Sequence, residues 1–209
     1  MRRIWSFFIL AVGLLLFTTG CPSFSTLHTA TPVEEGETEM TLSASYLGMG
    51  ASDAETGDSV NFSVPTFEVA GRHGLSPDLD VGAKIYPIGM GVDVNYAFLN
   101  EPNFALSANP YVGLTRAGNA GYGFALLNLL ADVAKTESVS ATLGLKPGVL
   151  YGFGGGSASA SPVVGGMAGV KLGLSDSFSI MPNVDVLYPL ADTGPFNTFL
   201  YTGGIAFNF

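Results

Sequence analysis

Hydrophobic and polar residues alternate along most of this chain. From Thr38 to the C-terminus, short segments in which every second residue is apolar are separated by turn-forming residues. A period of two is typical of β-strands with one apolar face, and about ten residues is the length of a tilted strand that crosses a membrane. We predict ten strands, at 38–49, 60–73, 79–88, 90–99, 104–115, 121–135, 139–152, 161–174, 178–189 and 197–209.

The composition favours a sheet whose outer surface is apolar. Charged residues make up 12% of the chain, about half of the roughly 25% typical of soluble domains, whereas 47% of the residues are hydrophobic and 28 are glycines. After residue 17, no apolar run reaches the ~18 residues that a membrane-spanning helix needs. We therefore predict one all-β domain at 38–209, an antiparallel transmembrane up-and-down β-barrel of about ten strands.

The predicted connections differ in length between the two ends of the barrel. Compact polar turns fall at 74–78, 100–103, 136–138 and 175–177. The other connections are mostly longer, at 50–59, 116–120, 153–160 and 190–196, with a short exception at Gly89. Transmembrane barrels have short periplasmic turns, so the compact turns predict the periplasmic side. An even number of strands then places both the N- and the C-terminus in the periplasm.

Charges within the predicted strands collect on one face. Alternate side chains point to opposite sides of a strand, and a Lys or Arg on the lipid face costs about 2–4 kcal/mol at mid-bilayer. We therefore expect the charged face to line the lumen, where four positive and five negative residues form a salt-bridge network that is nearly neutral. These residues are Glu68, Arg72, Asp80, Lys84, Asp93, Asp132, Lys146, Lys171 and Asp185.

The second predicted strand departs from this parity. In the strand at 60–73, Phe62 and Val64 share a face with Glu68 and Arg72. A β-bulge near Pro65 would switch the faces, and a strand that begins later would remove the conflict. Both explanations stay open at this point.

Residues 1–20 are a predicted secretory signal peptide, with two arginines followed by an apolar core at 4–17. Small residues at 18–20 precede Cys21, and this arrangement resembles the lipobox of bacterial lipoproteins, although Thr18 stands where the motif usually has Leu. The resemblance implies that lipoprotein-processing enzymes lipidate Cys21 as the first mature residue. Cleavage at a nearby site by ordinary signal peptidase is the alternative.

Residues 21–37 are predicted to be the lipidated N-terminus and a solvated polar linker, because they are rich in Ser, Thr and Pro and then acidic. Removing the signal peptide leaves 6 of the 8 basic residues against 17 acidic ones, so the formal charge falls from −9 to −11. No nucleic-acid partner is expected at that charge. Cys21 is the single cysteine, so a disulfide within the chain is excluded.

The C-terminus carries the most specific motif. Thr202, Gly204, Phe207 and Phe209 place a polar residue, a glycine and two aromatic residues at the end of the last predicted strand. This pattern resembles the terminal β-signal of bacterial outer-membrane β-barrel proteins, and the resemblance extends over 38–209. It implies a place in the bacterial outer membrane, contact with its lipid, and recognition of these four residues by the barrel-assembly machinery. It implies an architecture and no activity.

No sequence pattern predicts catalysis, a cofactor or a metal site. The chain has one cysteine and two histidines, His28 in the linker and His73 at the end of a predicted strand, without zinc-like spacing. Neither histidine falls near the predicted outer rim, where a nucleophile would need it. We expect no enzymatic activity.

Three roles therefore stay open. The first is a structural or surface-exposed outer-membrane barrel with a side-chain-filled lumen, since about ten strands leave little interior space. The second is a small pore or a carrier of hydrophobic compounds. The third is a periplasmic β-sandwich lipoprotein. The sequence contains no indication of a ligand or an oligomeric state.

Overall fold

The computed structural model describes residues 23–52, 59–117, 120–154, 157–190 and 199–209. The chain in these ranges forms eleven strands: β1 (Thr38–Ser52), β2 (Ser59–Ser76), β3 (Leu79–Tyr86), β4 (Gly89–Glu101), β5 (Phe104–Ala117), β6 (Ala120–Lys135), β7 (Val139–Leu145), β8 (Gly148–Gly154), β9 (Ser157–Ser175), β10 (Phe178–Pro189) and β11 (Phe199–Asn208). No helix within the described ranges is long and apolar enough to cross a membrane.

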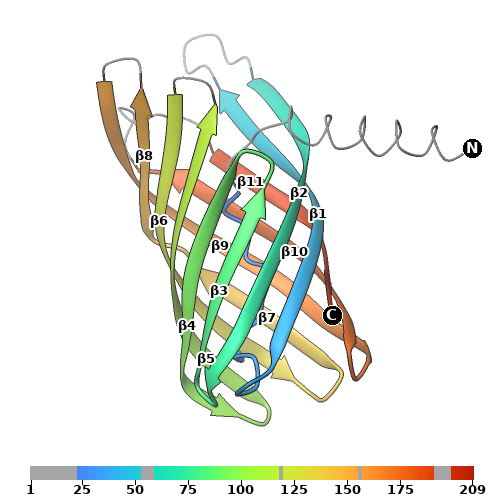
Figure 1. Ribbon diagram of the computed structural model, residues 1–209. Coiled ribbons are helices and arrows are strands. Elements are labelled where there is room, and N and C mark those ends of the chain that lie inside the picture. Colours follow the sequence, from blue (N-terminus) through green and yellow to red (C-terminus); the bar gives the residue numbers. More distant parts are fainter. Residues whose placement is uncertain (1–22, 53–58, 118–119, 155–156, 191–198) are drawn as a thin grey trace, which may run out of the picture.

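The described strands form one closed antiparallel sheet (Figure 1). Apart from β7 and β8, strands that are neighbours along the chain pair with each other, and β11 returns to pair with β1 from Thr41↔Asn208 to Gly50↔Phe199, which closes the ring. Both β7 and β8 lie between β6 and β9 and so share one position. The described ring therefore has ten strand positions, and the predicted all-β barrel is confirmed.

A break at Lys146 and Pro147 divides the strand that the sequence predicts at 139–152. Proline has no backbone N–H to give to the ladder. The neighbouring backbone groups continue the pairing, because Lys146 N donates to Gly165 O over 2.9 Å and Leu127 N donates to Pro147 O over 2.9 Å. The same face therefore points inward on both sides of the break.

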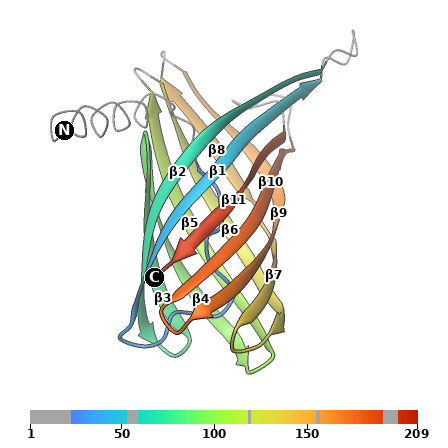
Figure 2. The ribbon, with the colours of Figure 1, turned by 90° about the vertical axis from the view of Figure 1, so that its right-hand side faces the viewer.

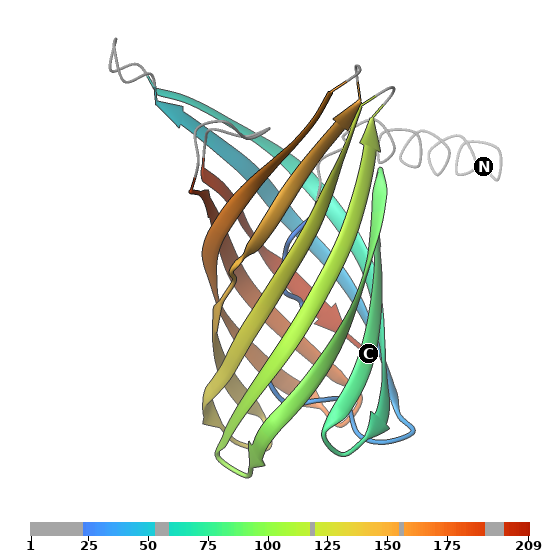
Figure 3. The same cartoon turned by 90° about the vertical axis from the view of Figure 1, so that its left-hand side faces the viewer.

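The two ends of the barrel differ as the turn lengths predict. The short connections after β2, β4, β6 and β9 lie together at one end, here called the compact-turn end. Phe209 approaches this end, where it exchanges two backbone hydrogen bonds of 3.0 and 2.9 Å with Met40. At the opposite, long-loop end, the hairpin of β1 and β2 leans outward to one side of the barrel (Figures 2 and 3).

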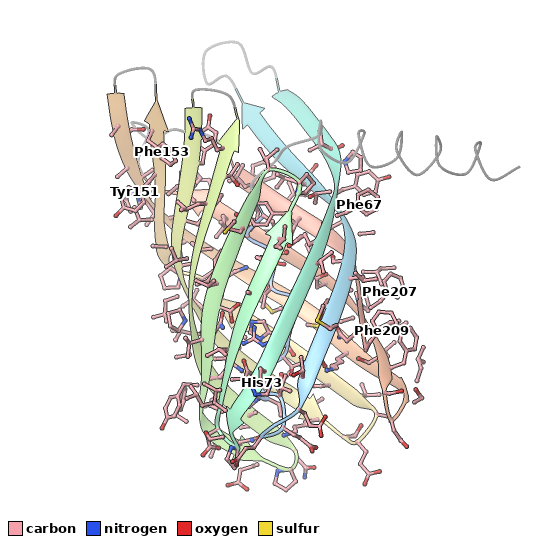
Figure 4. The ribbon with its side chains drawn as sticks, viewed as in Figure 1. Phe67, His73, Tyr151, Phe153, Phe207 and Phe209 are labelled. Atoms are coloured by element: carbon pink, nitrogen blue, oxygen red, sulfur yellow. The ribbon has the colours of Figure 1, made fainter. Side chains whose placement is uncertain are left out.

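Large apolar side chains cover the outer face of the barrel. Aromatic residues such as Phe67, Tyr151 and Phe207 are 47%, 47% and 37% exposed and point away from the ribbon (Figure 4). The alternation is strict along β10, where the inward Asp185 is fully buried between the exposed Val184 and Val186. The wall thus presents an apolar surface outward and most of its charge inward.

The parity conflict in β2 has neither of the two causes that the sequence suggested. The pairing of β1 with β2 runs without a register shift from Thr38↔His73 to Ser52↔Ser59, so there is no bulge near Pro65 and the strand does not begin late. Val64 faces inward and packs against a cluster of buried apolar side chains. The inner face of the barrel is itself apolar at this level, so an apolar residue can point inward without a bulge or a shift in register.

Candidate functional site

Residues 23–33, here called the luminal segment, lie inside the barrel. Figures 1 and 2 show this part of the chain as a blue trace enclosed by the strands. Every residue from Ser23 to Ala30 is buried, although most of them are polar. The expectation of a solvated linker is therefore wrong for the luminal segment. It holds only for the acidic stretch at 34–37, which is exposed.

The chain leaves the lumen after residue 33, and a tight turn at the compact-turn end leads it into β1. Gly36 has a φ of 82°, which L side chains rarely adopt, and its N–H donates to Gly74 O over 2.9 Å. Gly74 N in turn donates to Glu37 O over 3.1 Å. A Cβ added at Gly74 would lie 2.0 Å from Glu34 O, so only glycine permits this close approach.

Asp132 on β6 is the clearest anchor of the luminal segment. Its carboxylate accepts hydrogen bonds of 3.0 Å from the amides of Ala30 and Thr31, and one of 2.7 Å from the Thr31 hydroxyl. Thr142 Oγ1 donates to it over 2.6 Å. Asp132 is fully buried and has no cation within ion-pair distance among the described residues. Its charge is therefore compensated by hydrogen bonds, three of which come from the segment.

Other wall side chains bind the main chain of the segment in the same manner. Two more carboxylates accept from its amides, and cationic, amide and phenol groups donate to its carbonyls. These contacts are Thr26 N to Asp185 (3.1 Å), Val33 N to Asp80 (2.9 Å), Lys146 Nζ to Phe24 O (2.6 Å), Lys84 Nζ to Ser25 O (2.6 Å), Asn183 Nδ2 to Thr26 O (3.0 Å), Asn95 Nδ2 to Ala30 O (3.4 Å) and Tyr111 OH to Ser23 O (3.0 Å).

The nine charged residues assigned to the lumen point inward, and six of them contact the luminal segment. Glu68 does so through the Ser25 hydroxyl, at 2.8 Å. The charges also pair with one another or with Glu39: Arg72 with Asp80 and Asp93, Lys84 with Glu68, Lys146 with Asp185, and Lys171 with Glu39. The wall charges thus bind the luminal segment and also form ion pairs among themselves.

Apolar side chains of the segment pack into two clusters of the inner wall. The first, here called the apolar collar, surrounds Phe24, which is 1% exposed; it contains Leu47, Tyr111, Phe124, Leu126, Leu150, Val163, Leu187 and Leu200. Leu27 and Ala30 lie in a second cluster with Ala70, Ala105, Leu130, Met167, Met181 and Ala206. The three segment side chains that enter these clusters are spaced three residues apart.

The level of the collar along the barrel follows from its neighbours in sequence. Leu47, Leu150 and Leu187 each adjoin an exposed tyrosine of the outer face, namely Tyr46, Tyr151 and Tyr188. Phe24 therefore lies at the level of these tyrosines, toward the long-loop end. The segment runs from the compact-turn end through much of the lumen.

Two cavities adjoin the luminal segment. One of about 670 Å³ opens at the compact-turn end and is lined by polar residues that include His28, Lys135, Lys171 and Asp176. The other, of about 20 Å³, lies between the segment and the wall near Arg72 and holds about one water-sized sphere. The segment is therefore approachable from the compact-turn end.

The residues of the predicted assembly signal lie on or next to β11, which closes the ring. Thr202 is buried inside, Phe207 and Phe209 are exposed outside, and a Cβ at Gly204 would lie 2.3 Å from Ser45 Cβ across the closing seam. Recognition by the barrel-assembly machinery stays a prediction. Cys21 lies outside the described residues.

The two histidines lie apart. His28 is buried in the luminal segment, whereas His73 is at the compact-turn end, with 2.9 Å between its Nδ1 and Thr38 Oγ1. No group of three or more His, Cys, Asp or Glu residues within the described ranges could hold a metal ion.

Sequence reasoning missed the luminal segment. A signal was present, because Phe24, Leu27 and Ala30 repeat every third residue in a stretch otherwise rich in Ser and Thr. A period of three is neither that of a strand nor that of an α-helix. It was therefore not recognised as a face that becomes buried.

No family model matches the chain, and no curated protein matches it. Solved structures similar to it include Neisserial surface protein A, at 11% identity and a TM-score of 0.43, with 82% of this chain and 97% of that chain covered. Ail, the attachment invasion locus protein of Yersinia pestis, has 14% identity and a TM-score of 0.36, with 84% and 99% covered. The translocator domain of the autotransporter NalP from Neisseria meningitidis has 12% identity and a TM-score of 0.49, with 100% and 95% covered. Likeness of this degree carries no information about a ligand or a role.

Proposed function

We propose that this chain is a non-catalytic bacterial outer-membrane β-barrel with a structural or surface-exposed role, whose lumen is closed by its own side chains and by the luminal segment. One observation carries the proposal. The main chain of residues 23–33 occupies the interior and is bound there by Asp132, Asp185 and other wall side chains. A lumen occupied in this way has no room for a wide aqueous channel.

Placement in a membrane is supported by the distribution of charge and apolar surface. Outward residues such as Val92, Val112 and Val186 are exposed and apolar, whereas the charged residues near mid-strand face inward. Exposed Tyr46 and Tyr188 on the outer face are suited to a membrane interface. We place the compact turns and Phe209 in the periplasm, because short turns lie on that side in such barrels.

Lipidation of Cys21 belongs to the same proposal. The even strand number alone does not assign the N-terminus to the periplasm, because the segment before β1 turns back into the lumen. Labelling with radioactive palmitate, compared between the wild type and Cys21→Ala, tests the modification. Equal incorporation into both chains would contradict it.

Conductance measurements test the closed lumen. The full chain, purified in detergent and shown to be folded by a heat-dependent shift in gel mobility, is added to a planar bilayer. We expect no stable single-channel steps. Regular steps of constant size from the folded, full-length chain would contradict the proposal.

A second role, a small pore or a carrier of hydrophobic compounds, is favoured by the apolar collar. An apolar inner wall is suited to an apolar solute if Phe24 were to leave it. Uptake of a hydrophobic compound that is lost when the gene is deleted would support this role over the first. The β-sandwich lipoprotein is excluded, because the described strands form one closed ring.

A further inference from the structure

We propose that the lumen is a binding site for an extended polypeptide, and that it accepts a chain like residues 23–33 in trans as well as in cis. The inference rests on the proposed occupied lumen and adds a ligand class to it: a non-helical peptide with apolar side chains at every third position. The resident ligand is the protein's own luminal segment.

The contacts recognise main-chain atoms, which every peptide possesses. Wall carboxylates accept from the amides of four segment residues, and wall donors reach the carbonyls of five. The donors reach carbonyls from Ser23 to Thr26 and at Ala30, and the carboxylates reach amides from Thr26 to Val33, so the wall recognises both kinds of main-chain group. The residues of the segment form no β-ladder with the wall apart from the Glu35↔Gly74 bridge beyond its end. Side chains therefore hold it, as they would hold a ligand.

The Asp132 carboxylate on the wall depends on the luminal segment for most of its hydrogen bonds. A buried carboxylate is costly unless it is paired or hydrogen-bonded, and three of the bonds to Asp132 come from Ala30 and Thr31. The interior without a peptide would leave this carboxylate with Thr142 as its partner within the wall. The buried charge of Asp132 is thus compensated by hydrogen bonds when a peptide main chain occupies the lumen.

Selectivity for the ligand comes from the two apolar clusters. The collar receives Phe24, and the second cluster receives Leu27 and Ala30. Thr26 lies between them, and its Oγ1 has no hydrogen-bond partner in the structure. A peptide therefore needs an aromatic residue at the first of these positions and tolerates change at Thr26.

Entry in trans is favoured at the compact-turn end. The stretch at 34–37 that ties the segment to β1 is exposed, and the cavity of about 670 Å³ opens beside it. A cut in this stretch would break the covalent tie without removing any contact between the lumen and residues 23–33.

The experiment uses the full chain with a specific protease site inserted between Glu34 and Glu35. The protein is folded first and then cut, and a fluorescent peptide of residues 23–34 is added. We expect saturable binding by fluorescence anisotropy and displacement of the cut segment. Uncut protein serves as the control and binds no peptide, because its own segment occupies the lumen.

Peptide variants distinguish main-chain recognition from apolar association. Methylation of the Ala30 amide removes a donor to Asp132 and is expected to weaken binding about tenfold or more, the usual worth of a hydrogen bond to a charged group. In a barrel carrying Asp132→Asn, the same methylation should weaken binding much less, since the pair would already be disrupted. A Thr26→Val peptide is the matched control and should bind like the original.

Each result bears on the proposal. Binding that is insensitive to methylation, or equally sensitive in both barrels, overturns main-chain recognition. A cut segment that stays in place while no labelled peptide enters overturns binding in trans. The proposed closed lumen fails separately, by conductance of the uncut chain. A silent uncut barrel that takes no peptide after cutting therefore contradicts only this inference.

Discussion

The barrel wall and the luminal segment are held by different kinds of hydrogen bond. In the wall, backbone groups pair with backbone groups of the next strand along the chain, and the ring closes where β11 meets β1. In the segment, backbone groups pair with side chains that lie 47 to 159 residues away in sequence, from Asp80 for Val33 to Asp185 for Thr26. The wall is therefore specified by a repeating pattern, whereas the segment depends on a few individual residues.

Replacing the whole segment should have the largest effect on this contrast. A chain whose residues 23–33 become a Gly/Ser stretch of equal length keeps the wall and its outer face. We expect ion conductance to appear and the free energy of unfolding to fall by several kcal/mol, on the order of 1 kcal/mol for each hydrogen bond lost. Recordings in planar bilayers measure the conductance. Urea titration, followed by the gel band of the folded protein, measures the free energy of unfolding. An unchanged, silent barrel would show that the segment is dispensable.

Phe24→Ala should have the next largest effect. It empties the apolar collar while leaving the main-chain contacts of the segment in place. Large-to-small changes of a buried Phe cost about 3–5 kcal/mol in soluble cores, and a lower value is expected here because water can enter the lumen. Phe67→Ala on the outer face, where the ring is 47% exposed, is the control. If the two variants lose the same free energy of unfolding in urea titration, the collar contributes no more to stability than an outer-face contact does.

Asp132→Asn should have a smaller effect than Phe24→Ala. The amide keeps the shape of the side chain but loses the charge that two main-chain N–H groups approach. We expect a loss of about 1–3 kcal/mol, as for a hydrogen bond to a charged group. Asp176→Asn, at an exposed turn of the same barrel end, should change the unfolding free energy by less than about 0.5 kcal/mol. A stable Asp132→Asn variant would indicate that the segment does not depend on this carboxylate.

Thr26→Val should have almost no effect. It removes a buried hydroxyl without a hydrogen-bond partner, while the Thr26 main chain keeps its bonds to Asp185 and Asn183. The free energy of unfolding from urea titration should stay within about 0.5 kcal/mol of the wild-type value. A large loss would mean that the Thr26 side chain, and not its main chain, is what the lumen recognises.

The wall could be predicted from the sequence because its rules are local. Alternation along β10 separates Asp185 from Val184 and Val186, and the same parity placed all nine lumen charges on the inner face. Where parity failed, in β2, the cause was the apolar collar around Val64, a property of neighbouring strands that one strand cannot show.

The luminal segment could not be predicted by the same rules. Its polar residues resemble those of a solvated linker, and what buries them is the alignment of Asp132, Asp185 and Lys146, brought together only when the ring closes. Asp132 carried a hint, since five acidic residues face four basic ones in the predicted lumen network. A buried carboxylate in excess of the cations needs hydrogen-bond donors, and the main chain of the segment supplies them.

Solvent accessibility of the luminal segment tests the central claim most directly. In a Cys21→Ala background, Ser25→Cys and Glu37→Cys place one thiol inside the lumen and one on the exposed stretch before β1. The structure predicts that a maleimide reagent labels position 37 rapidly in the folded barrel and labels position 25 only after denaturation. Equal, rapid labelling of both positions in the folded protein would contradict it, because residues 23–33 would then lie outside the barrel.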